Sequence, residues 1–424
     1  MNDMSRQIIS TLIGKTVKQA AKLRGGGSAL PGLVVEKLDP GFLRRTLAKI
    51  PGGVVIISGT NGKTTTTKIV VELLEAAGLK VFTNRTGSNF SRGVAAALLG
   101  EINLRGRLKA DIAVLELDEA WAVKFVKLIK PRYSLLLNVM RDQLDRFGEI
   151  DTAAGFLEKI AVATTKTAVL NRDDPRVFKI YEKMPTQPVF FGTTTELLRL
   201  MPTDDALRTG DAKANDLIHA DVSLEAIEGQ NATFMIDQQR YSVPMRLNGV
   251  YNLLNAAAAL SLVRQILGAK ADTPQLLQAL SQVQPAFGRG ETIMLNGTPI
   301  ELILVKNPSG FRLSVRSFAR DGVLNMIAIN DNYADGRDVS WLWDVEFSRL
   351  ASVAVVSGVR AYDMALRLGY DDITPQHIEP DLAHALAQFV AREPKKPKHI
   401  YCSYTAMTTL RKLLAEQTDV EVIS

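Results

Sequence analysis

The stretch Val54-Val55-Ile56-Ile57-Ser58-Gly59-Thr60-Asn61-Gly62-Lys63-Thr64-Thr65-Thr66 decides the fold. Its first half is a β-branched apolar run, which is typical of a strand buried in a parallel sheet. A turn with two glycines ends the run, and a helical pattern follows over residues 67–77. This order predicts a phosphate-binding loop, because free backbone amides at a helix N-terminus point toward an anion.

The residue types in this loop fit nucleotide chemistry. Gly59 and Gly62 let the backbone approach phosphate closely, Lys63 is expected to neutralise the β- and γ-phosphates, and the Thr64 hydroxyl is expected to bind Mg²⁺. The general phosphate-binding motif has eight residues and begins with a glycine, but this chain has Ile57 at that position. The chain therefore carries a shortened form of the motif, and this form narrows the class of nucleotide-binding protein to which it can belong. The alternative is a turn that binds no nucleotide. The predicted loop residues are Gly59, Thr60, Asn61, Gly62, Lys63, Thr64 and Thr65.

Composition excludes several classes of protein. The 424 residues predict two or three domains, and 46% hydrophobic with 23% charged residues is typical of a soluble globular chain. No apolar run approaches the roughly 18 residues that span a bilayer, and no signal peptide is recognisable, so we expect a cytoplasmic protein. The single cysteine, Cys402, excludes an internal disulfide and a cysteine-rich metal site, and we interpret it as a core thiol. No basic-aromatic module indicates nucleic acid.

The N-terminal segment reads as an amphipathic basic helix over residues 5–24. Two interpretations remain open. The helix either lies on a membrane surface or packs on the body of the protein, which we favour. Its apolar side carries Ile8, Ile9, Leu12, Ile13 and Val17, and its basic side carries Lys15, Lys18, Lys22 and Arg24.

Apolar strands ending in polar turns recur along the chain, at 111–119, 133–148 and 167–175. This rhythm predicts a doubly wound, mostly parallel sheet, in which ligands bind at the carboxyl ends of the strands. An acidic residue at such an end, close to a phosphate-binding loop, is the expected second magnesium ligand. Glu116 is our choice, with Asp118 and Glu119 as competitors.

A second α/β unit is expected from about residue 298, with strands near 300–305, 324–329, 353–358 and 399–401. The second of these strands runs into an acidic and aromatic turn over residues 331–344, which is a candidate site. A capped turn with buried tryptophans is the alternative.

These motifs together resemble a known family. Residues 59–65 resemble the ATP loop of Mur ligases and folylpolyglutamate synthases, and residues 138–148, 171–174, 248–255 and 289 resemble the later motifs of the same domain in order. Asn330-Asp331-Asn332-Tyr333-Ala334-Asp335-Gly336-Arg337-Asp338-Val339-Ser340-Trp341 looks like the C-terminal motif of MurT-type subunits of lipid II isoglutaminyl synthase.

The resemblance implies three domains: an N-terminal helix and linker (1–45), a central ATP-binding domain (46–295) and a smaller C-terminal α/β domain (296–424). It also implies an ATP-dependent amide ligase that converts the D-glutamate α-carboxylate of the lipid II stem peptide to D-isoglutamine through an acyl phosphate. ATP and Mg²⁺ are the implied cofactors, and Thr64 and Glu116 the implied metal ligands. The further nucleotide contacts that it implies are Asn171, Asp174, Asn252, Asn255 and Arg289.

The resemblance implies a partner as well. In this family a separate GatD-type glutaminase releases ammonia from glutamine, and the C-terminal domain docks it and lends an aspartate to its Cys-His pair. Asp338 is the predicted aspartate and Asp335 the runner-up. Lipid II is the implied substrate, and weak contact with the membrane that carries it is a hypothesis for the N-terminal helix.

Two departures from the family pattern are visible. Many MurT-like proteins carry a four-cysteine zinc ribbon, and this chain has no cysteine before Cys402, so we expect no zinc site and a plain loop at 203–218. Gln143 stands where many Mur ligases have a histidine, and it can position groups but cannot act as a base. Two other functions remain possible: a stand-alone ligase of the Mur or folylpolyglutamate type, and a nucleotide-binding scaffold without catalysis.

Overall fold

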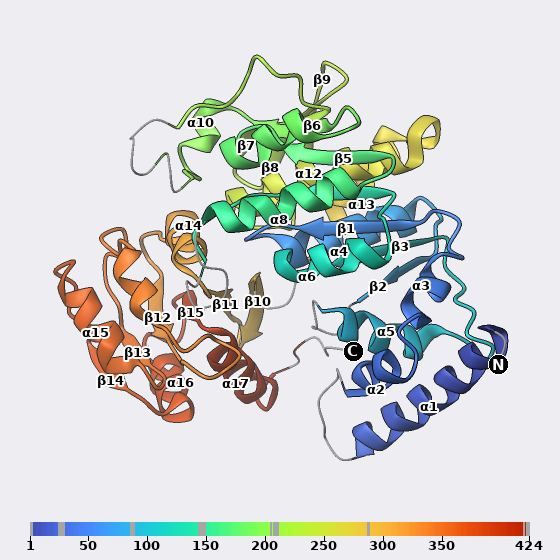
Figure 1. Ribbon diagram of the computed structural model, residues 1–424. Helices are drawn as coiled ribbons and strands as arrows, with labels where there is room; N and C mark the ends of the chain where they lie inside the picture. The colour runs from blue at the N-terminus through green and yellow to red at the C-terminus, as the bar shows by residue number, and fades with distance from the viewer. Residues whose placement is uncertain are drawn as a thin grey trace.

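Strand β1 (Val54–Ser58) lies inside a nine-stranded sheet with the order β2-β3-β1-β4-β5-β6-β7-β8-β9. A second sheet has six strands in the order β10-β11-β15-β12-β13-β14. The computed structural model describes residues 3–23, 30–84, 90–142, 150–203, 206, 212–285, 289–418 and 420. Figure 1 shows the two sheets in separate α/β units, with the N-terminal helices beside the first.

The first sheet is parallel from β2 to β7, and β8 and β9 extend it antiparallel. The antiparallel strands β8 and β9 are therefore an extension of the main sheet. The strands besides β1 are β2 (Val81–Thr83), β3 (Ile112–Glu116), β4 (Tyr133–Leu136), β5 (Thr167–Asn171), β6 (Val189–Thr193), β7 (Val222–Glu228), β8 (Asn231–Ile236) and β9 (Gln239–Pro244).

Helices cover both faces of this sheet, which explains why β1 is buried at every position and apolar from Val54 to Ile57. Val55 and Ile57 face the core shared with α4 (Lys63–Ala76), α12 (Val250–Leu267) and α13 (Thr273–Gln282). Val54 and Ile56 face the opposite core. Its helices are α2 (Leu30–Leu38), α3 (Phe42–Leu47), α5 (Ser91–Glu101), α6 (Glu119–Leu128) and α8 (Ile150–Ala163).

Helix α12, with the short turn η2 (Gly268–Lys270), is long and apolar enough to cross a membrane. Two thirds of that stretch is buried inside the protein, however, and Ala256–Ala259 are fully buried. The small alanine side chains let the helix lie close to the sheet. The helix is therefore a core element of the central domain. Short elements complete this domain: α9 (Pro175–Phe178), η1 (Lys179–Lys183) and α10 (Thr195–Leu198).

Helix α1 (Asp3–Leu23) packs on the body of the protein against α2 and α5. The buried side is not the apolar side that the sequence pattern indicates. Gln7, Ser10, Thr11 and Gly14 are buried, whereas several isoleucine and leucine side chains of the helix are exposed.

The second sheet is parallel except for the β10–β11 hairpin, and helices again cover both faces. Strand β10 belongs to this sheet, although it precedes the predicted domain boundary at 295/296. Cys402 is a buried free thiol of this core, as expected, and burial raises its pKa. The elements are β10 (Arg289–Leu295), β11 (Thr298–Leu304), α14 (Pro308–Phe318), β12 (Leu324–Ala328), η3 (Ser340–Asp344), β13 (Val355–Ser357), α15 (Ala361–Gly369), β14 (His377–Glu379), α16 (Leu382–Ala391), β15 (Lys398–Cys402) and α17 (Tyr404–Ala415).

Candidate active site

The loop between β1 and α4 has the backbone that its glycines predict. Gly59 and Gly62 have φ angles of 137° and 89°, and Gly62 is the residue immediately before α4. A Cβ atom on Gly62 would lie 2.6 Å from Oδ1 of Asn255. Both the left-handed backbone and the close approach therefore require glycine at this position.

Asn138, which follows β4, holds the loop from the neighbouring strand. The Asn61 backbone N–H donates to Asn138 Oδ1 (2.9 Å), and Asn138 Nδ2 donates to the Asn61 carbonyl (3.0 Å). The Thr60 N–H donates to the Asn138 carbonyl at 3.0 Å. These bonds fix the loop before any ligand binds, and preorganisation of this kind lowers the entropic cost of binding.

Lys63 is buried at the start of α4 and surrounded by acids. Its Nζ donates to the carbonyls of Gly59 and Thr60 and lies 3.5 Å from Glu119 Oε2. Burial lowers the pKa of Lys63, but the nearby carboxylates raise it by more, so the side chain is an ammonium at neutral pH. The carboxylates that raise it are Glu119, Asp118, Asp142 and Glu116.

Thr64 and Glu116 are brought together as the prediction of a magnesium site requires. Thr64 Oγ1 donates to Glu116 Oε1 at 2.9 Å, and two bonds between Asn84 and the Glu116 backbone hold this end of β3. Nearby, Asp118 Oδ1 is buried and accepts no hydrogen bond from the described residues. Burial raises the pKa of Asp118, although Lys63 opposes the shift.

These oxygens fit Mg²⁺. The ion prefers hard oxygen ligands and usually combines one or two carboxylates with waters and substrate phosphates, rather than a cage of protein groups. The described ranges contain no cluster of three or more His, Cys, Asp or Glu residues with metal-binding geometry. One hydroxyl and one or two carboxylates are therefore the donor set that this site offers. Of the competing ligands, Glu119 instead faces Lys63.

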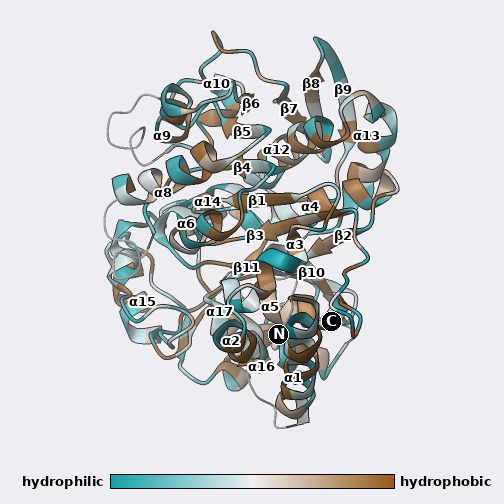
Figure 2. Ribbon diagram, turned by 45° about the vertical axis from the view of Figure 1, so that its right-hand side comes forward, coloured by the Kyte–Doolittle hydropathy of each residue, from teal (hydrophilic) through white to brown (hydrophobic). Residues whose placement is uncertain are grey.

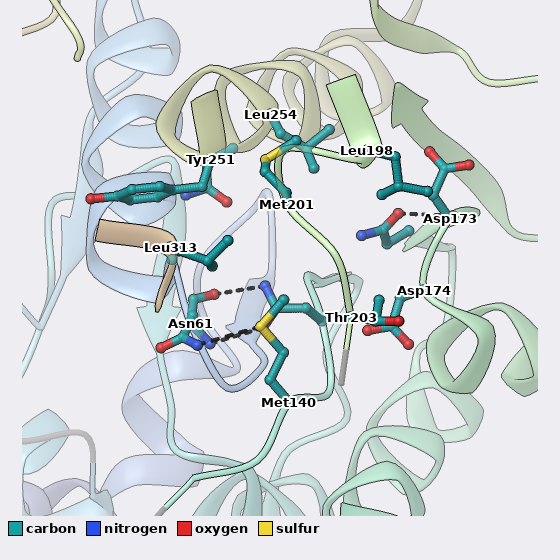
Figure 3. Close-up of a pocket in the computed structure, with 14 residues that line it drawn as sticks. Asn61, Met140, Asp173, Asp174, Leu198, Met201, Thr203, Tyr251, Leu254 and Leu313 are labelled. Atoms are coloured by element: carbon teal, nitrogen blue, oxygen red, sulfur yellow. Dashed lines mark hydrogen bonds between the residues drawn. The ribbon is translucent and has the colours of Figure 1, made fainter. Parts of the chain in front are cut away.

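A pocket opens beside the loop and encloses about 510 Å³, including the part open to solvent. In Figure 3, Leu198, Met201 and Leu254 gather on one side of the pocket, with Asn61 and Met140 opposite. The apolar walls with a few polar groups suit a planar base joined to a sugar.

Most of the predicted nucleotide contacts meet in this pocket. Asn171, Asp174 and Asn255 line it. Asn252 does not; its Nδ2 donates to the Asn248 carbonyl (2.6 Å), and its Oδ1 is buried without a described partner. The side chain of Arg289, like all of residue Gln143, lies outside the described residues.

Asp174 has a structural role that the sequence motif does not reveal. Its carboxylate accepts the backbone N–H groups of Arg176 and Val177 at the start of α9, and that of Val139 (2.7 Å) after β4. Burial raises the pKa of Asp174 to about 6, although these three bonds oppose the shift. Asp174 thus joins two strand ends at the pocket wall.

The C-terminal domain closes the other side of the site. Asn307 is fully buried and begins α14, with its Oδ1 accepting the Gly310 N–H (2.7 Å). Its Nδ2 donates to Asn61 Oδ1 (3.2 Å) and Asp142 Oδ1 (2.9 Å). Leu313 of α14 also lines the pocket. The sequence motifs did not indicate a role for Asn307. The pattern that could have indicated one is a polar turn with a proline directly after a buried strand, which is typical of a helix start.

The two candidate aspartates of the C-terminal turn differ in surroundings. Asp335 is buried and accepts the Thr405 N–H (2.7 Å), the Thr405 hydroxyl (2.5 Å) and the Asn332 N–H. It therefore anchors the turn to the start of α17. Asp338 is half-buried, and its Oδ1 accepts the Ser340 N–H (2.8 Å). The turn is capped, as the alternative interpretation predicts, but only Trp341 is buried, and Trp343 is 48% exposed.

Comparisons with known proteins agree with this architecture. The model of the Mur ligase middle domain matches residues 57–263, and that of the MurT ligase C-terminal domain matches residues 304–407. The chain is similar to the MurT subunit of lipid II isoglutaminyl synthase (glutamine-hydrolyzing) from Streptococcus pneumoniae R6, with 30% identity over 96% of this chain and 97% of that protein. The corresponding subunit of Staphylococcus aureus COL is 29% identical over 90% of this chain and 92% of its own length.

Solved structures show the same fold at low identity. MurF from Acinetobacter baumannii has a TM-score of 0.68 at 19% identity and covers 91% of this chain and 80% of its own. MurF from Thermotoga maritima in complex with ADP has a TM-score of 0.67 at 19% identity, covering 91% and 84%.

Fold and site together define an ATP-dependent ligase with the Mur ligase architecture. Within that class, the near full-length match shows that the chain belongs to the family of MurT subunits of lipid II isoglutaminyl synthase. The word subunit in the names of these relatives implies that a partner chain exists.

Gly62→Ala tests the loop, with Gly78→Ala as a matched control. Gly78 has a similar φ of 86°, but a Cβ there would meet nothing within 4 Å. Both variants should lose roughly 1 kcal/mol of stability from the left-handed backbone. We expect only Gly62→Ala to weaken MgATP binding, by about tenfold or more, in calorimetric titration. Equal affinity in the two variants would show that the close approach at Gly62 is not needed.

Proposed function

We propose that this chain amidates the α-carboxylate of D-glutamate in the stem peptide of lipid II, using ATP. The observation that carries the proposal is a preorganised phosphate loop, with Lys63 and the Thr64–Glu116 pair, facing a MurT-type C-terminal domain. The reaction belongs to peptidoglycan synthesis, and its need for ATP and glutamine supports a cytoplasmic location as part of this proposal.

The chemistry requires activation of the acceptor. A carboxylate is a poor electrophile, so an oxygen of the D-glutamate carboxylate first attacks the γ-phosphorus of ATP, and the bond to the ADP oxygen breaks. Ammonia then attacks the acyl carbon of the resulting acyl phosphate, inorganic phosphate leaves, and the nitrogen loses a proton. Lys63 is the positive charge that spreads the developing negative charge on the phosphoryl oxygens.

Mg²⁺ would be held by Thr64 and Glu116, and when bound it would supply Lewis-acid neutralisation of the phosphates. Asn171 and Asn255 would contact the base and ribose in the pocket, and Asp174, whose carboxylate accepts three backbone N–H groups, would hold the pocket wall in place. Asn307 would keep the C-terminal domain on the loop during the reaction, because it bonds to both Asn61 and Asp142.

Ammonia would come from a GatD-type glutaminase docked on the C-terminal domain. Cys402 is buried with a raised pKa and cannot serve as a glutaminase nucleophile. Asp338 suits the role of the lent aspartate better than Asp335, because Asp335 is buried and occupied by three hydrogen bonds within its own chain.

An exposed apolar face lies next to that turn and suits a docking site. Tyr362 and Leu366 of α15 are 66% and 60% exposed and lie one helical turn apart, and Tyr370 beyond them is 73% exposed. Arg360, just before α15, pairs with Asp331 of the turn (2.7 Å). Contiguous exposed apolar residues with aromatic members mark protein interfaces.

The stand-alone amino-acid ligase is the alternative, and it predicts activity of the chain alone with a free amino acid. The exposed aromatic face on α15 favours the partner-dependent enzyme. A scaffold without catalysis is disfavoured by the geometry of Lys63, Thr64 and Glu116.

Amidation of lipid II by the chain together with the glutaminase tests the function. We expect either glutamine or ammonium to serve as the nitrogen source. The product should be lipid II whose mass is lowered by replacement of a carboxyl OH with NH₂. Asp338→Asn should lose the glutamine-driven reaction and keep the ammonium-driven one, because the aspartate acts on the partner's histidine and not on the ATP site. Full glutamine-driven activity of this variant would show that Asp338 is not the aspartate that assists the Cys-His pair of the glutaminase. No product from either nitrogen source would refute the proposed function.

Tyr362→Ser with Leu366→Ser tests the docking face. We expect glutaminase binding, measured by surface plasmon resonance, to weaken by about tenfold or more, while ammonium-driven amidation stays unchanged. Leu128→Ser with Leu200→Ser is the matched control, since these leucines of the central domain are about half exposed. Unchanged binding in the α15 variant would place the interface elsewhere.

A further inference from the structure

Helix α1 is packed with its apolar side outward. Ile9, Leu12 and Ile13 are 44%, 46% and 38% exposed. On the opposite side of the helix, Gln7, Ser10, Thr11 and Gly14 face the protein. A helix held to a globular body ordinarily buries its apolar stripe, so this arrangement leaves the apolar side available to another partner.

Specific contacts fix this orientation. Gln7 Nε2 donates to Thr46 Oγ1 (2.8 Å), and Ser10 Oγ donates to Asp39 Oδ2 (2.9 Å). These residues are buried, so rotating the helix to bury the isoleucines would leave polar groups without partners.

Gly14 adds a steric reason. A Cβ there would lie 2.6 Å from side-chain atoms of both Leu99 and Val35, so the helix backbone lies directly against α5 and α2. Only a residue without a side chain permits this approach. The outward apolar face is thus a consequence of close packing by small and polar residues.

A basic loop lies beside the N-terminal half of α1. A Cβ on Gly106 would meet the Gln7 side chain at 2.5 Å, which places this loop against the helix. Leu104 is 60% exposed, and Arg105, Arg107 and Lys109 around it are exposed as well.

The net charge of the chain comes from its first fifty residues, which include α1. Residues 1–50 contain nine Lys or Arg and three Asp or Glu, a net charge of +6. This equals the net charge of the whole chain, so the other 374 residues are neutral overall. Within α1, exposed Arg6 and half-buried Lys15 lie near the apolar residues.

We propose that the outer face of α1, with the loop 103–109, rests on an anionic lipid bilayer. This inference deepens the proposed function, because it names the surface that would hold the enzyme at the inner face of the membrane beside a lipid-linked substrate. Exposed aliphatic side chains enter the headgroup boundary, and flanking cations attract anionic lipids. Figure 2 shows α1 at one end of the molecule with hydrophobic segments along its ribbon.

Two observations favour a bilayer over the other occupants, a second copy of the chain and the glutaminase. The face is bordered by cations, and two such faces would repel each other across a symmetric interface. In Figure 1, α1 lies apart from α15, so docking of a glutaminase on the C-terminal domain would leave the face of α1 uncovered.

Co-sedimentation of the full chain with vesicles tests the proposal. The probes are vesicles of pure phosphatidylcholine and vesicles with roughly 30% phosphatidylglycerol, without lipid II or nucleotide. We expect binding to the anionic vesicles that weakens as salt rises. The variants are Ile9→Ser with Leu12→Ser, and Arg105→Glu with Arg107→Glu, and each should bind about tenfold more weakly or worse. Leu128→Ser with Leu200→Ser is the control and should bind like the wild type.

The outcomes separate this inference from the proposed function. Absence of vesicle binding, or equal binding by the Ile9/Leu12 variant and the wild type, would overturn the membrane face. Light scattering without vesicles tests for a dimer. A concentration-dependent dimer that the Ile9/Leu12 variant abolishes would assign the face to a second copy of the chain and would also overturn the membrane proposal. Ammonium-driven amidation of a water-soluble lipid II analogue should remain unchanged in the variants, because α1 lies outside the ATP site.

Discussion

A buried ammonium among carboxylates is the interaction on which the site depends. Burying a charge costs several kcal/mol unless it is paired and hydrogen-bonded. Lys63 meets both conditions through Glu119 and through two carbonyls of its own loop. The same side chain that stabilises the loop would then turn its charge to the phosphates of a bound nucleotide. The excess of carboxylates around Lys63 also leaves a negative balance that a divalent cation would neutralise.

The seam between the two domains gives the site its second half. Asn307 begins α14 and reaches across the seam to the phosphate loop, and Arg141 pairs with Asp344 at 3.2 Å near the same contact. Asn248 also donates to Glu301 (3.2 Å), which joins the start of α12 to β11. These polar contacts join the two domains beside the phosphate loop, so residues of both domains form the site.

Local chemistry explains what the sequence could predict. The phosphate loop, the Thr64–Glu116 pair and the parallel sheet follow from motifs that lie within one strand-turn-helix unit or at consecutive strand ends. Long-range partners could not be predicted in the same way. Asn138 and Asn307 meet Asn61 from 77 and 246 residues away, and nothing in the local pattern pairs them. The sequence pattern of α1 identifies its apolar side, but it does not predict that this side faces away from the protein. Gly14 and two buried hydrogen bonds decide which side of the helix packs on the body.

The central claim is that phosphoryl transfer from ATP activates the D-glutamate carboxylate. Following an oxygen atom of this carboxylate through the reaction tests the claim most directly. Lipid II labelled with oxygen-18 in the D-glutamate α-carboxylate would be amidated with ATP and ammonium, and the released phosphate analysed by mass spectrometry. An acyl phosphate requires one labelled oxygen to appear in inorganic phosphate for each amide formed, because ammonia displaces the oxygen that attacked the γ-phosphorus. Amide formation with unlabelled phosphate would contradict the account, since the carboxylate would not have been activated by phosphoryl transfer at the Lys63 site.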